Sequence, residues 1–238
     1  MLVVPNYKQT PILTNVLLVV TFFGIKLQIS LIIMEEVSKI AENKLISATS
    51  KEEILVKSLW EEKACVITFF RRFGCGFCRL AAKDLSSIKS ILDANNVRLI
   101  GIGVEELGVE DFINGKFFEG DLFIDCEKKC YTDLGYKRFG MLSIIPALAT
   151  KTSRDAIFKA KAENVGGDMK GDKYQVGGTL VISKGGKKVL LNHKQESLAD
   201  HIHPSEVLKS LGIEAEINDK VEGEKTVTCN EVACEASG

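Results

Sequence analysis

The stretch ACVITFF at residues 64–70 runs directly into RRFGCGFCR at residues 71–79. A continuous apolar run rich in β-branched and aromatic residues predicts a strand covered on both faces, as in parallel sheets. Helical spacing follows it, with apolar residues four, three and four positions apart: Ala81, Leu85, Ile88 and Leu92. Two cysteines, Cys75 and Cys78, are therefore predicted to lie between the end of a buried strand and the first turn of a helix.

The rest of the chain continues the alternation of strands and helices. We expect strands over 44–47, 53–57, 97–104 and 121–125, helices over 109–118 and 126–134, and a terminal helix from Pro204. Residues 179–183 and 187–191 flank Lys-Gly-Gly, which is a hairpin signal. Residues 136–176 read as an irregular insertion with one lysine-rich helical piece. Alternation closed by a hairpin and a helix predicts an α/β thioredoxin-like fold with a central mixed sheet flanked by helices.

The overall composition and charge of the chain limit the kinds of function that it can have. The 238 residues carry a formal net charge of −1, from 31 basic and 32 acidic side chains mixed along the chain. That balance argues against nucleic acid as a partner. The seven cysteines are an odd number, so they cannot all pair within one chain. A chain long enough for a large core does not need disulfides, which favours a reducing compartment.

The ends of the chain differ from its middle. Residues 12–33 are almost wholly apolar, broken by Lys26 and Gln28, and are long enough for one membrane span. Three interpretations stay open for residues 1–33: a signal anchor that tethers the protein to a membrane, an unusual extension, or upstream sequence before a true start at Met34. We favour the last because residues 34–216 read as a complete domain. The polar tail, residues 217–238, is expected to be disordered.

The chemistry is expected at the two motif cysteines. Cys75 at the start of a helix would face free amide N–H groups and the positive end of the helix dipole, which favour a thiolate. Three basic neighbours would act in the same direction: Arg71, Arg72 and Arg79. Cys78 lies one helical turn further on. The arrangement predicts Cys75 as the attacking nucleophile and Cys78 as the resolving thiol.

The remaining cysteines and histidines offer weaker alternatives. Cys126 and Cys130 would complete a zinc site with the motif pair, but redox chemistry is favoured because Cys-x-x-Cys beside a βαβ pattern is typical of it. Cys65 is expected in the core, and Cys229 and Cys234 in the tail without a role. The histidines His193, His201 and His203 are too scattered for a metal cluster, and the last two are expected in a solvated loop. We predict no metal site and no bound cofactor.

Several segments in the same order carry a family resemblance. Besides residues 71–79, they are Asp-Leu-Ser-Ser at 84–87, Val-Arg-Leu-Ile-Gly at 97–101, Leu-Gly-Tyr-Lys-Arg at 134–138, Leu-Ser-Ile-Ile-Pro at 142–146, and the glycine-rich strand at 177–186 with Val-Leu-Leu at 189–191. Over roughly residues 40–215 the chain resembles the peroxiredoxin-like 2 family, most closely its prostamide/prostaglandin F synthase branch.

The resemblance implies a specific reaction. It implies a cytosolic, thioredoxin-dependent oxidoreductase that reduces the endoperoxide of prostaglandin H2, or of its ethanolamide, to the F-type product. Electrons would come from NADPH indirectly, through thioredoxin as the protein partner. The family's two motif cysteines correspond to Cys75 and Cys78. An apolar groove for the lipid endoperoxide is expected beside Cys75, with Phe73, Phe77 and Leu142 as its walls.

Two departures from related folds keep alternatives open. Gly177-Gly178 stands where thioredoxins place a cis-proline, and Phe70-Arg71-Arg72 replaces the Thr or Pro of typical peroxiredoxins. A general peroxiredoxin-like antioxidant that reduces small hydroperoxides or disulfides is the alternative enzyme. A non-catalytic redox or zinc-stabilised module is the alternative outside enzymes.

Overall fold

A mixed sheet of seven strands forms the centre of the molecule. The computed structural model describes residues 37–140, 151–168 and 170–215. The strands are β1 (Lys44–Ser47), β2 (Glu53–Leu55), β3 (Ala64–Phe70), β4 (Val97–Gly103), β5 (Asp121–Ile124), β6 (Gly178–Ile182) and β7 (Val189–Lys194), in the spatial order β2-β1-β5-β4-β3-β6-β7. β3, β4 and β5 are parallel, and every other neighbouring pair is antiparallel. The predicted mixed sheet is confirmed.

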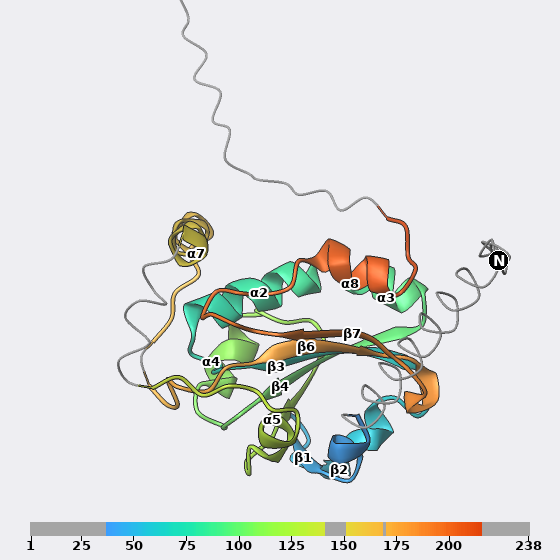
Figure 1. Cartoon of the computed structure of the whole chain (residues 1–238). Helices are drawn as coiled ribbons and strands as arrows, with labels where there is room; N and C mark the ends of the chain where they lie inside the picture. The colour runs from blue at the N-terminus through green and yellow to red at the C-terminus, as the bar shows by residue number, and fades with distance from the viewer. Residues whose placement is uncertain (1–36, 141–150, 169, 216–238) are drawn as a thin grey trace, which may run out of the picture.

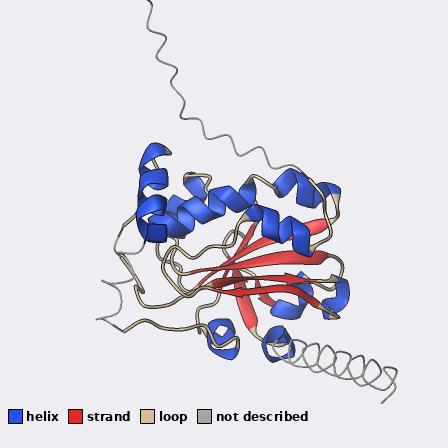
Figure 2. Cartoon of the chain, turned by 45° about the horizontal axis from the view of Figure 1, so that its top comes forward, coloured by secondary structure: helices blue, strands red, loops and turns tan. Residues whose placement is uncertain are grey.

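Helices cover both faces of this sheet. They are α2 (Gly76–Ser86), α3 (Lys89–Ala94), α4 (Val109–Asn114), α5 (Lys129–Asp133), α7 (Lys151–Ala162) and α8 (Pro204–Ser210), with short 3-10 turns at Val56–Leu59 and Lys184–Gly186. α2, α3 and α8 lie over one face, and α5 lies on the other (Figure 1). α7 lies outside α2, and the strands are enclosed between two helical layers (Figure 2).

The central strand explains why the fold places the motif at a sheet edge. β3 is buried along almost its whole length, and its side chains point alternately to the two faces of the sheet, where they join apolar clusters. Val66 packs with the residues under α2, α3 and α8, whereas Ile67 and Phe69 pack on the α5 side. A strand apolar on both faces can only sit in the middle of a covered sheet. Its carboxyl end therefore delivers residues 71–79 to the edge where ligands bind in such folds.

Several elements differ from the expectation; the helices predicted over 109–118 and 126–134, for example, are Val109–Asn114 and Lys129–Asp133. The single helix predicted after the motif is divided into two helices, α2 and α3. The hydroxyls of Ser86 and Ser87 donate hydrogen bonds to the carbonyls of Ala82 and Asp84. They compete with the helical hydrogen bonds at this point. The predicted strand over 53–57 ends at Leu55, where a 3-10 turn begins. The insertion over 136–176 contains the regular helix α7, which the lysine-rich pattern only indicated.

Some predictions fall on residues outside the described ranges. These are the apolar extension over 1–33 with Met34, the polar tail over 217–238 with Cys229 and Cys234, and the segment with Leu142 and Pro146. Within the described ranges, none of the helices has both the length and the apolar character that a membrane span requires.

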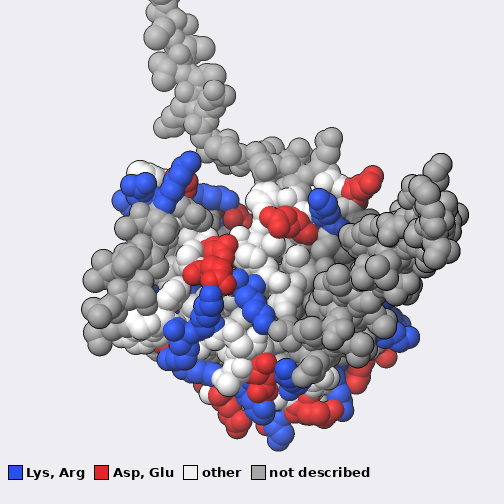
Figure 3. All heavy atoms as spheres, in the orientation of Figure 1, with Lys and Arg blue, Asp and Glu red and all other residues white. Residues whose placement is uncertain are grey.

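The surface agrees with the nearly neutral net charge. Basic and acidic side chains are interspersed on the face seen in Figure 3. Many form exposed ion pairs, such as Lys57 with Glu42 at 2.9 Å and Arg98 with Asp121 at 2.7 Å. That face therefore has no extended basic surface of the kind that binds the phosphate backbone of a nucleic acid.

Candidate active site

Cys75 caps the helix that follows the central strand. Its backbone is extended, with φ −80° and ψ 121°, and its carbonyl accepts the first intrahelical hydrogen bond from the amide of Arg79 at 2.9 Å. The eleven-residue helix α2 starts at Gly76. The thiol therefore lies at the positive end of the helix dipole, as the sequence predicts.

Cys78 lies directly against Cys75 in the first turn of α2. The Cys78 thiol donates a hydrogen bond to the Cys75 sulfur, and this bond is the largest cause that lowers the pKa of Cys75 well below its ordinary value. Burial opposes the shift, while the charges of Arg71 and Arg72 support it. The same contact, together with burial, raises the pKa of Cys78 well above its ordinary value. One sulfur is held as the anion and the other as the proton donor.

Arg71 is a buried cation in contact with the reactive sulfur. Its Nη1 lies 3.5 Å from Sγ of Cys75, and the side chain is 4% exposed. Nε donates to the carbonyl of Gln175 at 3.2 Å, Nη1 also reaches the carbonyl of Leu198 at 3.5 Å, and Nη2 donates to the carbonyl of Lys173 at 3.4 Å. Three backbone carbonyls from two loops thus fix the guanidinium beside the thiol, where its charge favours the thiolate.

The other two predicted arginines hold a loop in place. Arg72 donates to the carbonyls of Lys170 and Asp168 and lies 3.5 Å from the Asp168 carboxylate, so it adds charge near Cys75 while its hydrogen bonds go to the loop. Arg79 donates to the carbonyls of Phe73 and Gly166 at 2.9 and 3.1 Å. Its guanidinium stacks 4.8 Å from the centre of the Phe117 ring. The structure therefore gives Arg79 a role in loop packing rather than a contact with the thiol.

Of the three predicted groove residues, Phe77 and Phe73 lie in the described ranges, and the structure places them differently. Phe77 lines a cavity beside Cys75 and is half-buried. Phe73, in contrast, is fully buried, with its ring 5.1 Å from that of Phe112. The expectation that Phe73 forms a groove wall is wrong because Gly103 leaves room for its ring in the core: a Cβ at that glycine would overlap the ring of Phe73.

The cavity beside Cys75 has a volume of about 330 Å³. Its walls combine apolar side chains with basic ones and come from the segment after β3, α2, α7, the loop after α7 and the loop after β7: Arg71, Arg72, Cys75, Gly76, Phe77, Ile157, Ala160, Lys161, Val165, Gly167, Asp168, Lys173 and Leu198. A mostly apolar hollow of this size with a few polar groups is typical of a small-molecule site.

Helix α7 forms the outer wall of this cavity. It is held to α2 by the ion pairs of Lys83 with Glu163 and of Lys159 with Asp84, both at 2.7 Å. Leu80 of α2 packs with Ala160 and Val165 in a small apolar cluster beneath it. The insertion that the sequence pattern leaves irregular therefore supplies about half of the cavity wall.

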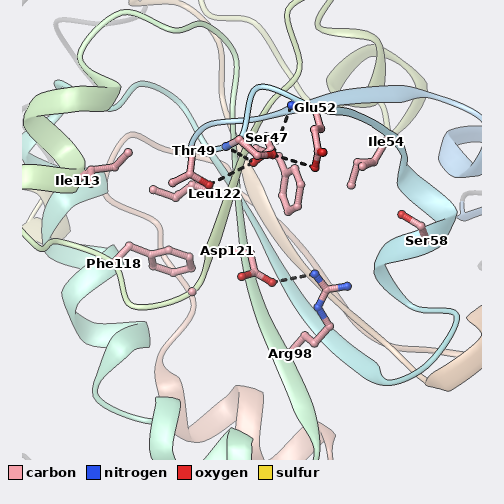
Figure 4. A pocket seen from close by; sticks show the side chains of 13 residues that line it. Ser47, Thr49, Glu52, Ile54, Ser58, Arg98, Ile113, Phe118, Asp121 and Leu122 are labelled. Atoms are coloured by element: carbon pink, nitrogen blue, oxygen red, sulfur yellow. Dashed lines mark hydrogen bonds and ion pairs between the residues drawn. The ribbon is translucent and has the colours of Figure 1, made fainter.

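A second hollow lies away from the cysteines. It has a volume of about 450 Å³ and is lined by the β1–β2 hairpin, β5 and the segment before β5 (Figure 4). Its side chains include Thr49, Glu52 and the Arg98–Asp121 ion pair, with no cysteine or histidine among the described residues that line it. This lining offers hydroxyl and carboxylate groups but no thiol chemistry.

The remaining cysteines do not join the motif pair. Cys130 is buried in the cluster on the α5 side, where its Sγ lies 3.7 Å from the side-chain Nδ2 of Asn43. Cys126, in contrast, is exposed. Burial raises the pKa of both thiols, and that of Cys65 to about 12. In the described ranges no three side chains of His, Cys, Asp or Glu converge as metal ligands. The alternative that Cys126 and Cys130 complete a zinc site with Cys75 and Cys78 is therefore not supported by their placement.

The structure corrects the expectation for one histidine. His201 is not in a solvated loop: its Nε2 is buried without a partner among the described residues, and its Nδ1 lies 2.5 Å from Nε2 of Gln195. Burial, with the nearby charge of Arg71, lowers the pKa of His201 to about 3. His203, in contrast, is exposed and accepts a hydrogen bond from the amide of Ser205 at the start of α8.

Residues far along the chain complete the site, and the sequence pattern does not predict them. Asp172 pairs with Lys128 and Arg138 at 2.6 and 2.9 Å and so fixes the loop whose carbonyls hold Arg71. Gly167 brings that loop against the start of α2, since a Cβ there would lie 2.5 Å from the amide of Gly76. The sequence signal for this packing is the density of glycines over 166–171.

The fold and the thiol pair define a thioredoxin-like, peroxiredoxin-like oxidoreductase. The structure resembles peroxidoxin BcpB from Mycobacterium tuberculosis with a TM-score of 0.52 and 16% identity, covering 74% of this chain and 96% of that one. A structure of peroxiredoxin Q from Xanthomonas campestris gives a TM-score of 0.51 and 12% identity, covering 74% and 92%. The AhpC/TSA antioxidant enzyme family model matches residues 84–197, just after the cysteines.

Sequence comparison identifies the family. The prostamide/prostaglandin F synthase of Xenopus tropicalis is 42% identical over 199 residues, covering 84% of this chain and 97% of the relative. The Homo sapiens protein of the same name is 47% identical over 170 residues, covering 71% and 86%. The chain belongs to the prostamide/prostaglandin F synthase family, which confirms the resemblance found in the sequence, and it is a thiol-dependent oxidoreductase.

Proposed function

We propose that this enzyme reduces the endoperoxide of prostaglandin H2, or of its ethanolamide, to the F-type product, with Cys75 and Cys78 as its catalytic thiols. The observation that carries the proposal is the position of Cys75: a helix-capping thiol with a lowered pKa that opens on a largely apolar cavity. The name that the relatives share supplies the substrate class.

The first step uses the anionic sulfur. The Cys75 thiolate attacks one oxygen of the strained O–O bond, so that an S–O bond forms and the O–O bond breaks. The second oxygen leaves as an alkoxide and takes up a proton. Arg71 stays beside the sulfur and would also stabilise negative charge as it develops on the oxygens.

The second step uses the neighbouring thiol. Cys78, which already contacts the Cys75 sulfur, attacks it and forms the disulfide while the S–O bond breaks. The second hydroxyl leaves after protonation. The thiolate and the thiol together supply two electrons and one proton, and solvent supplies the second proton, which balances one endoperoxide reduced to one diol.

Regeneration requires an external dithiol. We propose thioredoxin as this partner, with NADPH as the indirect source of electrons and a cytoplasmic setting. Disulfide exchange with a reduced dithiol would return Cys75 and Cys78 to thiols. The scheme runs on these two thiols and the external dithiol, without a step assigned to a bound cofactor.

The decisive assay couples thioredoxin, thioredoxin reductase and NADPH to the purified enzyme. F-type product from prostaglandin H2, detected by mass spectrometry, should appear with the wild-type enzyme and not with Cys75→Ser. Cumene hydroperoxide, run in parallel, tests the alternative of a general antioxidant enzyme. NADPH consumption with the hydroperoxide but not with the endoperoxide would overturn the proposal in favour of that alternative.

A further inference from the structure

A buried tyrosine on the far face of the sheet connects the ends of two central strands. Tyr131 belongs to α5, which lies on the face opposite α2 (Figure 1), and it is 1% exposed. Its hydroxyl donates to the carbonyl oxygens of Phe70 and Ile102, at 2.7 and 2.8 Å. Phe70 ends β3, and Ile102 lies next to the end of β4. One hydroxyl therefore joins the carboxyl ends of two neighbouring parallel strands, at the edge of the sheet where Cys75 lies.

Asp125 fixes the helix that carries this tyrosine. It follows β5 directly, and its amide donates to the carbonyl of Gly103 at the end of β4, at 2.9 Å. Its buried carboxylate accepts from the amides of Lys129 and Cys130, at 3.0 and 2.8 Å. These amides belong to the first turn of α5, where amide groups have no partner within the helix. The start of α5 is thus tied to the ends of β4 and β5.

The hydroxyl of Tyr131 stays protonated next to the two carbonyls. Burial is the largest cause that raises the pKa of Tyr131 well above its ordinary value. The titratable groups around it act in the same direction: Asp125, Tyr136, Cys130 and Cys78. Tyr131 is therefore a hydrogen-bond donor throughout the pH range in which Cys75 titrates.

The Phe70 carbonyl belongs to the peptide bond that leads into Arg71. Because a peptide unit is planar, a hydrogen bond to its oxygen also restricts the direction in which Arg71 leaves the strand. Distant carbonyls hold the guanidinium at the far end of the side chain, whereas Tyr131 holds the peptide at its base. The 3.5 Å contact between Nη1 of Arg71 and Sγ of Cys75 depends on both ends. A charge at contact distance loses effect as it moves away, so a displaced backbone would weaken its action on the thiol.

We propose that Tyr131 is a positioning residue of the reaction, whose hydroxyl fixes the Phe70–Arg71 peptide so that the guanidinium stays in contact with the Cys75 thiolate. Tyr131 acts through Arg71 rather than on the substrate. The inference rests on the proposed function, because the thiolate that this contact stabilises performs the first step of that reaction.

The test is the pH profile of Cys75 alkylation in Tyr131→Phe, measured in the full-length protein. The substitution keeps the ring that packs 5.4 Å from Phe69 and 5.8 Å from Tyr136, and removes only the hydroxyl. We expect alkylation by iodoacetamide at neutral pH to slow about threefold, because the charge of Arg71 remains but is less firmly placed. The two rates should converge above about pH 9, where Cys75 is ionised in both proteins.

This profile separates positioning from a purely structural role. A hydroxyl that only stabilised the fold would lower the unfolding temperature of Tyr131→Phe and leave its alkylation profile superimposable on that of the wild type, which would overturn the inference. Tyr136→Phe is the matched control, since it removes a hydroxyl from a buried tyrosine of the same aromatic cluster. Its alkylation profile should equal that of the wild type.

A double variant tests the route through Arg71. In an Arg71→Gln background, Tyr131→Phe should slow alkylation no further, because the charge on which it acts is already absent. A second, additive slowing would overturn the inference. Alkylation needs no substrate, so the result is independent of the proposed function. Absence of F-type product from the wild-type enzyme would overturn the proposed function, while the alkylation profiles would still decide whether Tyr131 positions Arg71.

Discussion

Nη1 of Arg71 lies 3.5 Å from Sγ of Cys75, four residues further along the chain. The two residues belong to different elements, since Arg71 follows β3 and Cys75 caps α2. The turn between them folds the guanidinium back over the thiol. This contact connects the end of the central strand with the acidity of the sulfur.

Replacement of Arg71 should therefore change the pH dependence of the thiol. In Arg71→Gln the pKa of Cys75 should rise toward that of a free thiol, and its alkylation by iodoacetamide at neutral pH should slow about tenfold, since a nearby opposite charge shifts a pKa by one unit or more. Rates measured from about pH 5 to 9, with peptide mass spectrometry, give the profile. Arg98→Gln, which removes a remote arginine, is the control; an unchanged profile in Arg71→Gln would contradict the assignment.

Replacement of Cys75 and replacement of Cys78 should impair the reaction at different steps. Cys75→Ser should abolish reduction, because no nucleophile remains. Cys78→Ser should allow one turnover per enzyme without thioredoxin-dependent cycling, because the first step needs only Cys75. Rapid-quench measurement of product per active site separates the two. Cys126→Ser, at an exposed thiol with a raised pKa, should behave as wild type.

The ion pairs of Asp172 with Lys128 and Arg138 should make the stability of the protein depend on pH. Burial opposes ionisation of this carboxyl, but hydrogen bonds with Lys128, the Tyr174 amide and Arg138 lower its pKa below the ordinary value. The stabilisation is present above the unfolded pKa, about 4, and is lost as pH falls through the lower folded value. Asp172→Asn should lower the free energy of unfolding by about 2 kcal/mol at neutral pH.

Urea unfolding at about pH 7 and about pH 3 measures this effect. The difference between Asp172→Asn and the wild type should shrink at the lower pH, because the carboxylate becomes protonated in the unfolded wild-type chain. A difference that is the same at both pH values would show that the carboxylate charge does not contribute. The exposed Glu53→Gln, which breaks the ion pair with Lys44, is the matched comparison.

Two adjacent glycines give a matched pair in the loop over α2. A Cβ at Gly167 would meet the amide of Gly76 at 2.5 Å, whereas nothing lies within 4 Å of one at Gly166. Gly167→Ala should cost about 1–3 kcal/mol of stability and alter Cys75 alkylation, because the loop must move from the helix start. Gly166→Ala should be neutral in both assays. Thermal unfolding and alkylation rates provide the readout; equal behaviour of the two variants would refute this packing.

The strands of the sheet are predictable because each signal is local. An apolar run marks β3 and Lys-Gly-Gly marks the β6–β7 hairpin, and the structure has both. The break between α2 and α3 is not predictable in the same way because apolar spacing continues through it, and the serine hydroxyls that end α2 carry no periodic signal. Local patterns indicate the elements but not the competition between side chain and backbone at their ends.

The site is predictable only in its sequence-local part. Cys75, Cys78 and the basic neighbours follow from the motif, but the carbonyl partners of Arg71 lie more than a hundred residues away. Phe73 is misassigned by its position beside the motif because its burial depends on the absent side chain of Gly103, on another strand. Such long-range complementarity leaves no trace in the spacing of a single sequence.

The reach of the Arg71 hydrogen bonds has a consequence for biosynthesis. One of the carbonyls that orient this guanidinium, that of Leu198, stands 127 positions further along the chain. While the ribosome is still making the second half of the protein, that partner does not exist, and one of the hydrogen bonds that hold Arg71 beside Cys75 is missing. The guanidinium therefore reaches its full set of partners beside Cys75 only after translation of the β7–α8 loop is finished.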